Sequence, residues 1–294
     1  MSRRGWFLFV LTGLLWGVPY LFIKVAVDPN NGFSPAAVVC LRTAIGAAIL
    51  IPWAIHQKSL GSALRGIKYV APYALLEMIG PWILIGTAEQ KISSGLAGLL
   101  VASVPIWATI FASLKGDKTV WHHKRLFGII LGFIGLVAVV GIESITGSAD
   151  PLSIAMVLVA SIGYSYAVMM VQSGLPGVSG IAINAVAMAL TALFYLPFTI
   201  AQWPTHHIST NAISAIIGLG VLSTGAAFAI FFTLTAIIGV ARASLVTYLN
   251  TAFAVVLGVI ILGEPLTIGI ILGLPLVLIG SYFASRKSEV RANA

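Results

Sequence analysis

Long uncharged apolar runs follow one another along almost the whole chain. Ten windows are long enough and apolar enough to cross a hydrocarbon core of about 30 Å as helices. They are residues 6–27, 34–55, 67–86, 92–114, 124–142, 152–171, 180–201, 211–234, 241–262 and 267–285. The connections between them are short, so consecutive helices should be antiparallel. The pattern therefore predicts an all-α membrane protein with ten transmembrane helices.

Two of these stretches, 94–117 and 241–264, share a plan that points to duplication. Each is rich in small residues at its start, polar or helix-breaking near its middle, and ends in a Gly-acid pair. In 241–264 the polar side chains gather within five residues, from Thr247 to Thr251. Hydrocarbon offers no hydrogen-bond partners, so such groups should face protein or a wet cavity. We expect a duplicated protein whose working surface lies between its halves.

Composition and charge add an orientation. The 294 residues are 59% hydrophobic and 8% charged, far below the roughly 25% charged residues of a soluble domain. The net charge of +8 is therefore not interpreted as a nucleic-acid signal. With the N-terminus in the cytoplasm, thirteen of the 16 Lys and Arg residues fall on inside segments and only Lys91 falls outside. The positive-inside rule then predicts that both termini are cytoplasmic.

Five helices in each half is an odd number, so the second half must enter the membrane from the opposite side. The expected organisation is two inverted-topology five-helix repeats, residues 1–145 and 146–294. A weak trace of the repeat is GIILG, at 128–132 and again at 269–273. Alignment of the whole helices instead pairs Gly128 with Gly273 and Gly135 with Gly280. For these glycines we favour close helix packing over a hinge role.

Three ionisable residues lie inside predicted spans, where each is costly. Glu77 is about ten residues into its helix, roughly 15 Å deep, and could bind a substrate amine or carry a coupling proton. Arg42 could bind a substrate carboxylate, and an ion pair with Glu77 explains both residues equally well. Lys24 lies near a helix end, where snorkelling to the interface is an adequate explanation.

Five aromatic or polar residues on helices that should line the interior complete the candidate substrate site: Trp16, Tyr20, Tyr164, Tyr248 and Asn250. Trp16 and Tyr20 are four residues apart and so share a helix face. A mixed aromatic and polar pocket suits small amphipathic solutes. Interfacial belts and packing remain the commoner explanation for aromatic residues in membranes.

Two residues are predicted to allow a gating bend. Pro105 removes a backbone donor inside its span, and Thr251 holds the corresponding place, beside Asn250, in the second half. Patterns of catalysis and cofactor binding are missing: the chain contains no Walker A sequence, no GxSxG and no metal-ligand cluster. We therefore expect no enzyme activity, no cofactor and no metal.

The chain resembles the EamA group of the drug/metabolite transporter superfamily over nearly its whole length. The segments that carry the resemblance are LLWGVPYLFIKVAV (14–27), SPAAVVCLRTAIGAAIL (34–50), SSGLAGLLVASVPIWATIFASL (93–114) and ARASLVTYLNTAFAVVLGVIILGEPLTIGIILGLPLVLIGSYF (241–283). Arg42 and Glu264 match positions commonly seen in that group. The resemblance implies ten helices in two inverted repeats, both ends cytoplasmic, and export of small metabolites by alternating access, with YddG-type amino-acid exporters as suggested relatives.

The expected function is a secondary transporter in the cell inner membrane that exports amino acids of broad range through a central cavity. Its partners would be the lipid bilayer, its small-molecule substrates and, through Glu77, protons, with no nucleic acid and with a monomer as the expected state. Export of drugs or nucleotide-like solutes is the alternative. A membrane enzyme or lipid-binding receptor ranks lower, because no catalytic cluster accompanies the apolar helices.

Overall fold

A computed structural model describes residues 2–116, 121–145, 150–239, 243 and 245–285. These residues form α-helices and two π-helical segments, with no strand among them. The elements are α1 (Arg3–Ala26), α2 (Pro35–His56), α3 (Leu60–Arg65), α4 (Ile67–Ala74), η1 (Leu75–Ile79), α5 (Gly80–Ala88), α6 (Ser94–Val101), α7 (Val104–Leu114), α8 (His123–Ile145), α9 (Pro151–Gly174), α10 (Gly180–Ala201), α11 (Thr210–Gly218), η3 (Leu219–Ala226), α12 (Ala227–Ile238), α14 (Val246–Leu262) and α15 (Ile268–Ser285). Asp117, Lys118, Arg242 and the basic tail from 286 onward, which the orientation and duplication arguments used, lie outside the described residues.

All ten predicted spans are helical, which confirms an all-helical membrane protein. Eight helical segments are long and apolar enough to cross a bilayer, and two shorter apolar helices, α14 and α15, follow them. The 17 residues of α14 rise only about 25 Å. Exposed large apolar side chains, such as Ile130 and Val137 on α8, cover the outside of the bundle, where lipid solvates them without cost.

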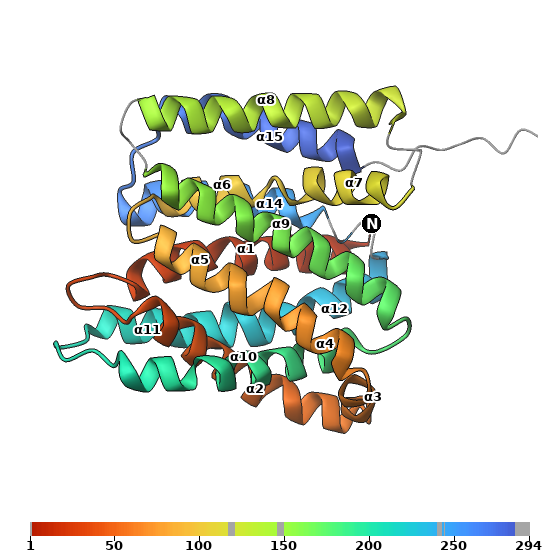
Figure 1. The fold of residues 1–294 in the computed structure, drawn as a ribbon, viewed down its shortest axis with the longest axis vertical. Coiled ribbons are helices and arrows are strands. Elements are labelled where there is room, and N and C mark those ends of the chain that lie inside the picture. The colour runs from red at the N-terminus through yellow and green to blue at the C-terminus, as the bar shows by residue number, and fades with distance from the viewer. Residues whose placement is uncertain (1, 117–120, 146–149, 240–242, 244, 286–294) are drawn as a thin grey trace, which may run out of the picture.

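The helices lie side by side in layers that run along one axis (Figure 1). Helices α8 and α15 form the outermost pair at the top of the figure, and α2 and α10 lie together at the bottom. Between them come α6, α7, α9 and α14, and then α1 and α5. α1 begins and α15 ends at the same end of the bundle, so the described helices start and finish on one side.

Equivalent irregularities in the two halves support the duplicated fold. The third span contains the π-helical η1, and the eighth span, its counterpart five helices later, contains the π-helical η3. α2 and α10 match as well: each begins at a serine, and Pro52 and Pro197 stand at the same distance from Ser34 and Ser179. A duplicated segment that keeps its breaks in register explains this agreement better than chance.

The α8–α15 contact shows why glycines recur in both helices. A Cβ on Gly128 would lie 2.7 Å from the Gly280 carbonyl oxygen, and one on Gly273 would lie 3.2 Å from the Gly135 oxygen. The sequence alignment pairs Gly128 with Gly273 and Gly135 with Gly280. If each glycine is replaced by its aligned partner, the first contact becomes the second, as a pseudo-two-fold axis requires. The helices run antiparallel with backbones touching, so these glycines serve packing.

Several predicted spans are not continuous helices. The third and eighth are interrupted by π-helix, and the fourth divides into α6 and α7 at Ala102–Ser103. There the Ser103 N–H donates to the Leu100 carbonyl (3.1 Å) in a tighter turn, and Pro105, which has no N–H, is the second residue of α7. The short helix α3 was not predicted, because six residues are too few for a periodic signal.

Candidate functional site

Arg42 is held in the interior of the bundle by an aromatic ring and a hydroxyl. Its side chain is 5% exposed, its guanidinium carbon lies 3.7 Å above the Trp82 ring of α5, and its Nη2 donates to Thr224 Oγ1 of η3 (3.2 Å). Stacking over a ring favours a desolvated cation. The Nε atom has no hydrogen-bond partner. Arg42 therefore keeps one free donor at a place where three spans meet.

Glu77 lies in η1, on the widened π-helical turn of the third span. One of its carboxylate oxygens, Oε2, is buried without a hydrogen-bond partner. π-helical segments often occur at functional sites. The described ion pairs do not include one between Glu77 and Arg42. The structural alternative considered for these two residues, a direct ion pair, is wrong, because the Arg42 guanidinium faces Trp82 and Thr224 instead.

Two tyrosines connect these charges. Tyr164 of α9 interacts electrostatically with Glu77, with Arg42 and with Tyr20 of α1. Tyr20 is buried and interacts with Arg42 as well. We name the five residues the central cluster: Tyr20, Arg42, Glu77, Trp82 and Tyr164. Four of them are predicted site residues, so the fold brings together side chains that the sequence spreads over more than 140 positions.

The other predicted substrate-binding residues contact different parts of the bundle. Trp16 packs against Phe231 of α12, with ring centroids 4.6 Å apart. Tyr248 meets Tyr282 of α15 edge to face at 6.3 Å. Asn250 Oδ1 lies 3.3 Å from the hydroxyl of its neighbour Thr251. These contacts explain the three residues by packing, and a role at the substrate stays a prediction.

The two predicted gating residues lie where α6, α7 and α14 meet. The Thr251 hydroxyl is within 3.4 Å of the Gly98 carbonyl oxygen of α6 and donates to the Thr247 carbonyl at 3.0 Å. Pro105 is the second residue of α7, just after the break in the fourth span. The two residues therefore border the same helix interruption, and whether it bends during transport stays a prediction.

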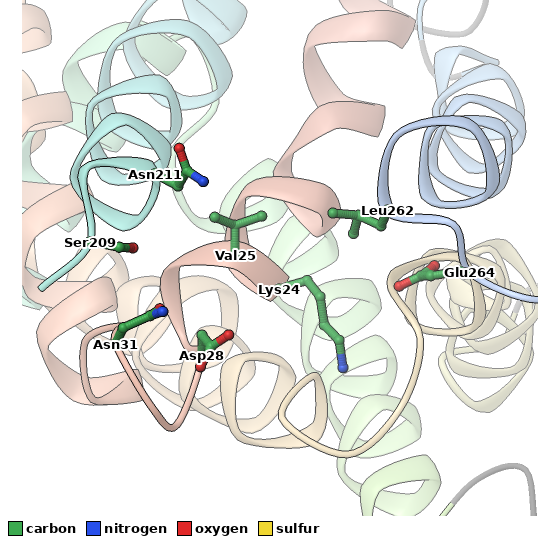
Figure 2. A pocket seen from close by; sticks show the side chains of 8 residues that line it. All are labelled: Lys24, Val25, Asp28, Asn31, Ser209, Asn211, Leu262 and Glu264. Atoms are coloured by element: carbon green, nitrogen blue, oxygen red, sulfur yellow. The ribbon is translucent and has the colours of Figure 1, made fainter.

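A second polar group, at the bundle end where α1 ends and α11 begins, was not assigned to the site by the sequence. A pocket of about 390 Å³ lies there, lined by side chains that Figure 2 shows: Lys24, Val25, Asp28, Asn31, Ser209, Asn211, Leu262 and Glu264. Lys24 does not simply reach water, as snorkelling predicts. Its Nζ donates to the backbone carbonyl oxygens of Glu89 and, at 2.8 Å, of Ile92.

Glu264, on the loop after α14, caps the start of α6. Its carboxylate accepts hydrogen bonds from the Ser94 N–H (2.7 Å), the Ser94 hydroxyl (2.8 Å) and the Gly95 N–H (3.1 Å). The Ser93 hydroxyl accepts the next one, from the Leu96 N–H (3.2 Å). Gly258 leaves room for the carboxylate, since a Cβ there would meet Glu264 Oε2. A residue of the second half thus satisfies the helix start in the first half.

Replacing Glu264 by alanine is expected to lower stability by about 0.5–2 kcal/mol, the usual range for losing a helix cap. Glu264→Gln should lose less, because its amide oxygen still accepts one N–H. Thermal unfolding of the purified protein in detergent measures both. Ser93→Ala is the matched comparison, because it removes the cap that the same segment supplies to α6. If Glu264→Ala and wild type unfold at the same temperature, the cap contributes nothing.

The fold and the buried ionisable residues define a class: a multi-pass membrane protein of duplicated helices that carries a basic and an acidic side chain in its interior, as solute carriers do. The model of the EamA-like transporter family matches residues 3–141 and 151–286, and the chain belongs to this family. It is therefore a membrane transporter by family.

Relatives agree in length as well as in kind. An uncharacterized transporter of Archaeoglobus fulgidus is 27% identical over 97% of this chain and 99% of its own. The uncharacterized transporter YoaV of Bacillus subtilis is 25% identical over 92% of both chains. YedA of Escherichia coli K12, an uncharacterized inner membrane transporter by name, is 24% identical over 94% of this chain and 91% of its own. One solved crystal structure, 18% identical and covering 97% of both chains, has the same fold with a TM-score of 0.63.

Proposed function

We propose that the protein is an inner-membrane secondary transporter that exports small metabolites, amino acids of broad range, by alternating access through a central cavity. Membership of the EamA-like family supports transport. The name of the relative YedA supports the inner membrane. The distribution of Lys and Arg supports cytoplasmic termini, with the pocket of Figure 2 then at the outer end.

One observation carries the choice of substrate class. Arg42 and Glu77 are a basic and an acidic side chain in the bundle interior that form no ion pair with each other, and each leaves a buried polar atom without a partner. Unpaired buried charges are costly, so a ligand that supplies both partners gains binding energy. An α-amino acid supplies both, a carboxylate for Arg42 and an ammonium for Glu77. The rings of Tyr20, Trp82 and Tyr164 offer apolar surface that tolerates varied side chains.

The helix interruptions supply the places for movement. In the proposed mechanism, the repeats 1–145 and 146–294 rock against each other while helices 3–4 and 8–9 bend. The π-helical segments η1 and η3 and the break between α6 and α7 lie in three of those four spans. The Glu264 cap joins the two repeats at one end and would have to open in one of the two states.

The direct experiment is uptake of a panel of labelled amino acids into proteoliposomes that contain the purified chain, with unlabelled amino acids as competitors. Saturable uptake that several amino acids compete for would support the proposal. If labelled nucleotides or cationic drugs were taken up and amino acids were not, the proposed substrate class would change from amino acids to those solutes.

Glu77→Gln is expected to reduce amino-acid counterflow about 10-fold or more, because hydrogen bonds to a charged group contribute about 1.5–3 kcal/mol. The amide keeps the shape and loses the negative charge, so folding should persist. Counterflow in proteoliposomes measures the effect. Asp150→Asn is the control: Asp150 is a surface cap of α9, and asparagine caps as well. Equal counterflow in Glu77→Gln and wild type would remove Glu77 from the site.

A further inference from the structure

Glu89 is the most deeply buried acidic residue that the structure describes. It follows the last residue of the span Ile67–Ala88, and its side chain is fully buried. Neither carboxyl oxygen, Oε1 or Oε2, has a hydrogen-bond partner. Burial raises the pKa of the Glu89 carboxyl well above its usual value. An ionised carboxylate left without partners would cost several kcal/mol, so this conformation suits the protonated form.

The charged groups around Glu89 come from every side. Lys24 of α1, Glu264 after α14 and Arg42 of α2 all interact electrostatically with its carboxyl, and so does the hydroxyl of Tyr20. Yet the Lys24 ammonium donates to the backbone carbonyl of Glu89, not to its carboxyl. The Lys24 ammonium is therefore near the Glu89 carboxyl but bonds to backbone carbonyl oxygens, and the carboxyl has no hydrogen-bond partner.

The position of Glu89 joins two sites. Lys24 and Glu264 line the pocket at the bundle end, and Arg42 and Tyr20 belong to the central cluster. The Glu89 carboxyl therefore interacts electrostatically with residues of the end pocket and with residues of the central cluster. Glu89 does not line the pocket of about 390 Å³, but Lys24 does, and the Lys24 ammonium bonds to the Glu89 carbonyl; the pocket is large enough for water.

We propose that the Glu89 carboxyl is a proton-binding site that exchanges its proton with water in the end pocket. Loss of the proton leaves a carboxylate, and the proton passes to that water. The Lys24 ammonium then pairs with the carboxylate and releases the carbonyl oxygens of Glu89 and Ile92. Protonation reverses both changes, so the proton decides which acceptors Lys24 binds at the junction of α5 and α6. That this exchange drives solute transport rests on the proposed function; the proton site itself does not.

The first test needs no substrate. Infrared difference spectra of the full chain in liposomes, recorded across a pH titration, report the C=O band of a protonated carboxylic acid. Wild type should keep such a band at neutral pH, Glu89→Gln should lose the part of it that Glu89 contributes, and Asp150→Asn should retain it whole. Lys24→Gln should raise the pH at which the band disappears, because the competing cation is gone. An unchanged band in Glu89→Gln would overturn the proposal. If Glu89→Gln does not fold, Glu89→Asp must change the pH at which the band disappears. An unchanged pH would also overturn the proposal.

The second test measures coupling in proteoliposomes with labelled amino acids, with and without an imposed pH gradient. We expect the ratio of the two uptakes to differ from 1 in wild type and to fall to 1 in Glu89→Gln. Amino-acid uptake in wild type that ignores the gradient would end the coupling but leave the proposed transport intact. A Glu89 band in a protein that moves no amino acid would support the proton site and overturn the substrate class.

Discussion

Replacing Arg42 by alanine is expected to abolish amino-acid counterflow almost completely, about 10- to 150-fold, while the protein still folds. The range corresponds to the 1.5–3 kcal/mol of hydrogen bonding to a charged group. In the proposed binding mode, a carboxylate bonds to the unpartnered Nε and the remaining guanidinium edge of Arg42, which is held by Trp82 and Thr224. Without the cation, the Thr224 hydroxyl can bond to another acceptor. The substitution also removes the cost of a charged side chain deep in the bilayer, so stability should change little.

Counterflow in proteoliposomes, with unfolding in detergent measured in parallel, separates binding from folding. Arg42→Lys should recover only part of the activity, because an ammonium keeps the charge but cannot stack on Trp82 as a planar guanidinium does. Arg65→Ala is the control, since Arg65 is an exposed arginine at the end of α3. Wild-type counterflow in Arg42→Ala would exclude Arg42 as the carboxylate ligand and leave the central cluster a structural feature.

The hydrophobic pattern predicted the helices because each span is a local property of about twenty consecutive residues. It could not predict the interruptions. The widened turns η1 and η3 depend on packing against other spans, and nothing in LLEMI or LGVLSTGA differs in hydropathy from an ordinary helix. The α6–α7 break was the exception, since Pro105 marks its place by removing a backbone donor.

The candidate site was predictable to the extent that burial of a charge in a span is itself unusual. Arg42 and Glu77 stand out for this reason, whereas their relation to each other depends on helix rotation, and the direct ion pair does not form. Glu89 escaped notice because the end of a span is an ordinary place for a carboxylate. Only the folded chain shows it fully buried, with Lys24 and Glu264 close enough to interact electrostatically with its carboxyl.

Substituting valine for Gly280 is expected to be the most damaging change outside the site. A Cβ at this position would meet the backbone nitrogen and Cα of Gly132, so no side-chain rotation relieves the clash. α8 and α15 must then separate, and membrane helices associate through such close packing, not through a hydrophobic effect. Overpacking costs about 1–3 kcal/mol where neighbours can yield; against a rigid backbone we expect loss of the folded, monodisperse protein in detergent.

Gly280→Ala adds the same Cβ without the two further methyl groups of valine, so it should be destabilised less and keeps the prediction measurable if the valine variant is lost. Gly141 is the matched control, because it lies in α8 and a Cβ there meets nothing within 4 Å. Alanine is favoured over glycine in a helix interior by about 0.8–1.0 kcal/mol. The same substitution should therefore have opposite effects on stability at the two positions. The unfolding temperature should fall for Gly280→Ala and stay the same or rise for Gly141→Ala. Equal shifts would mean that the α8–α15 contact is not as close as the structure has it, and that these glycines serve something other than packing.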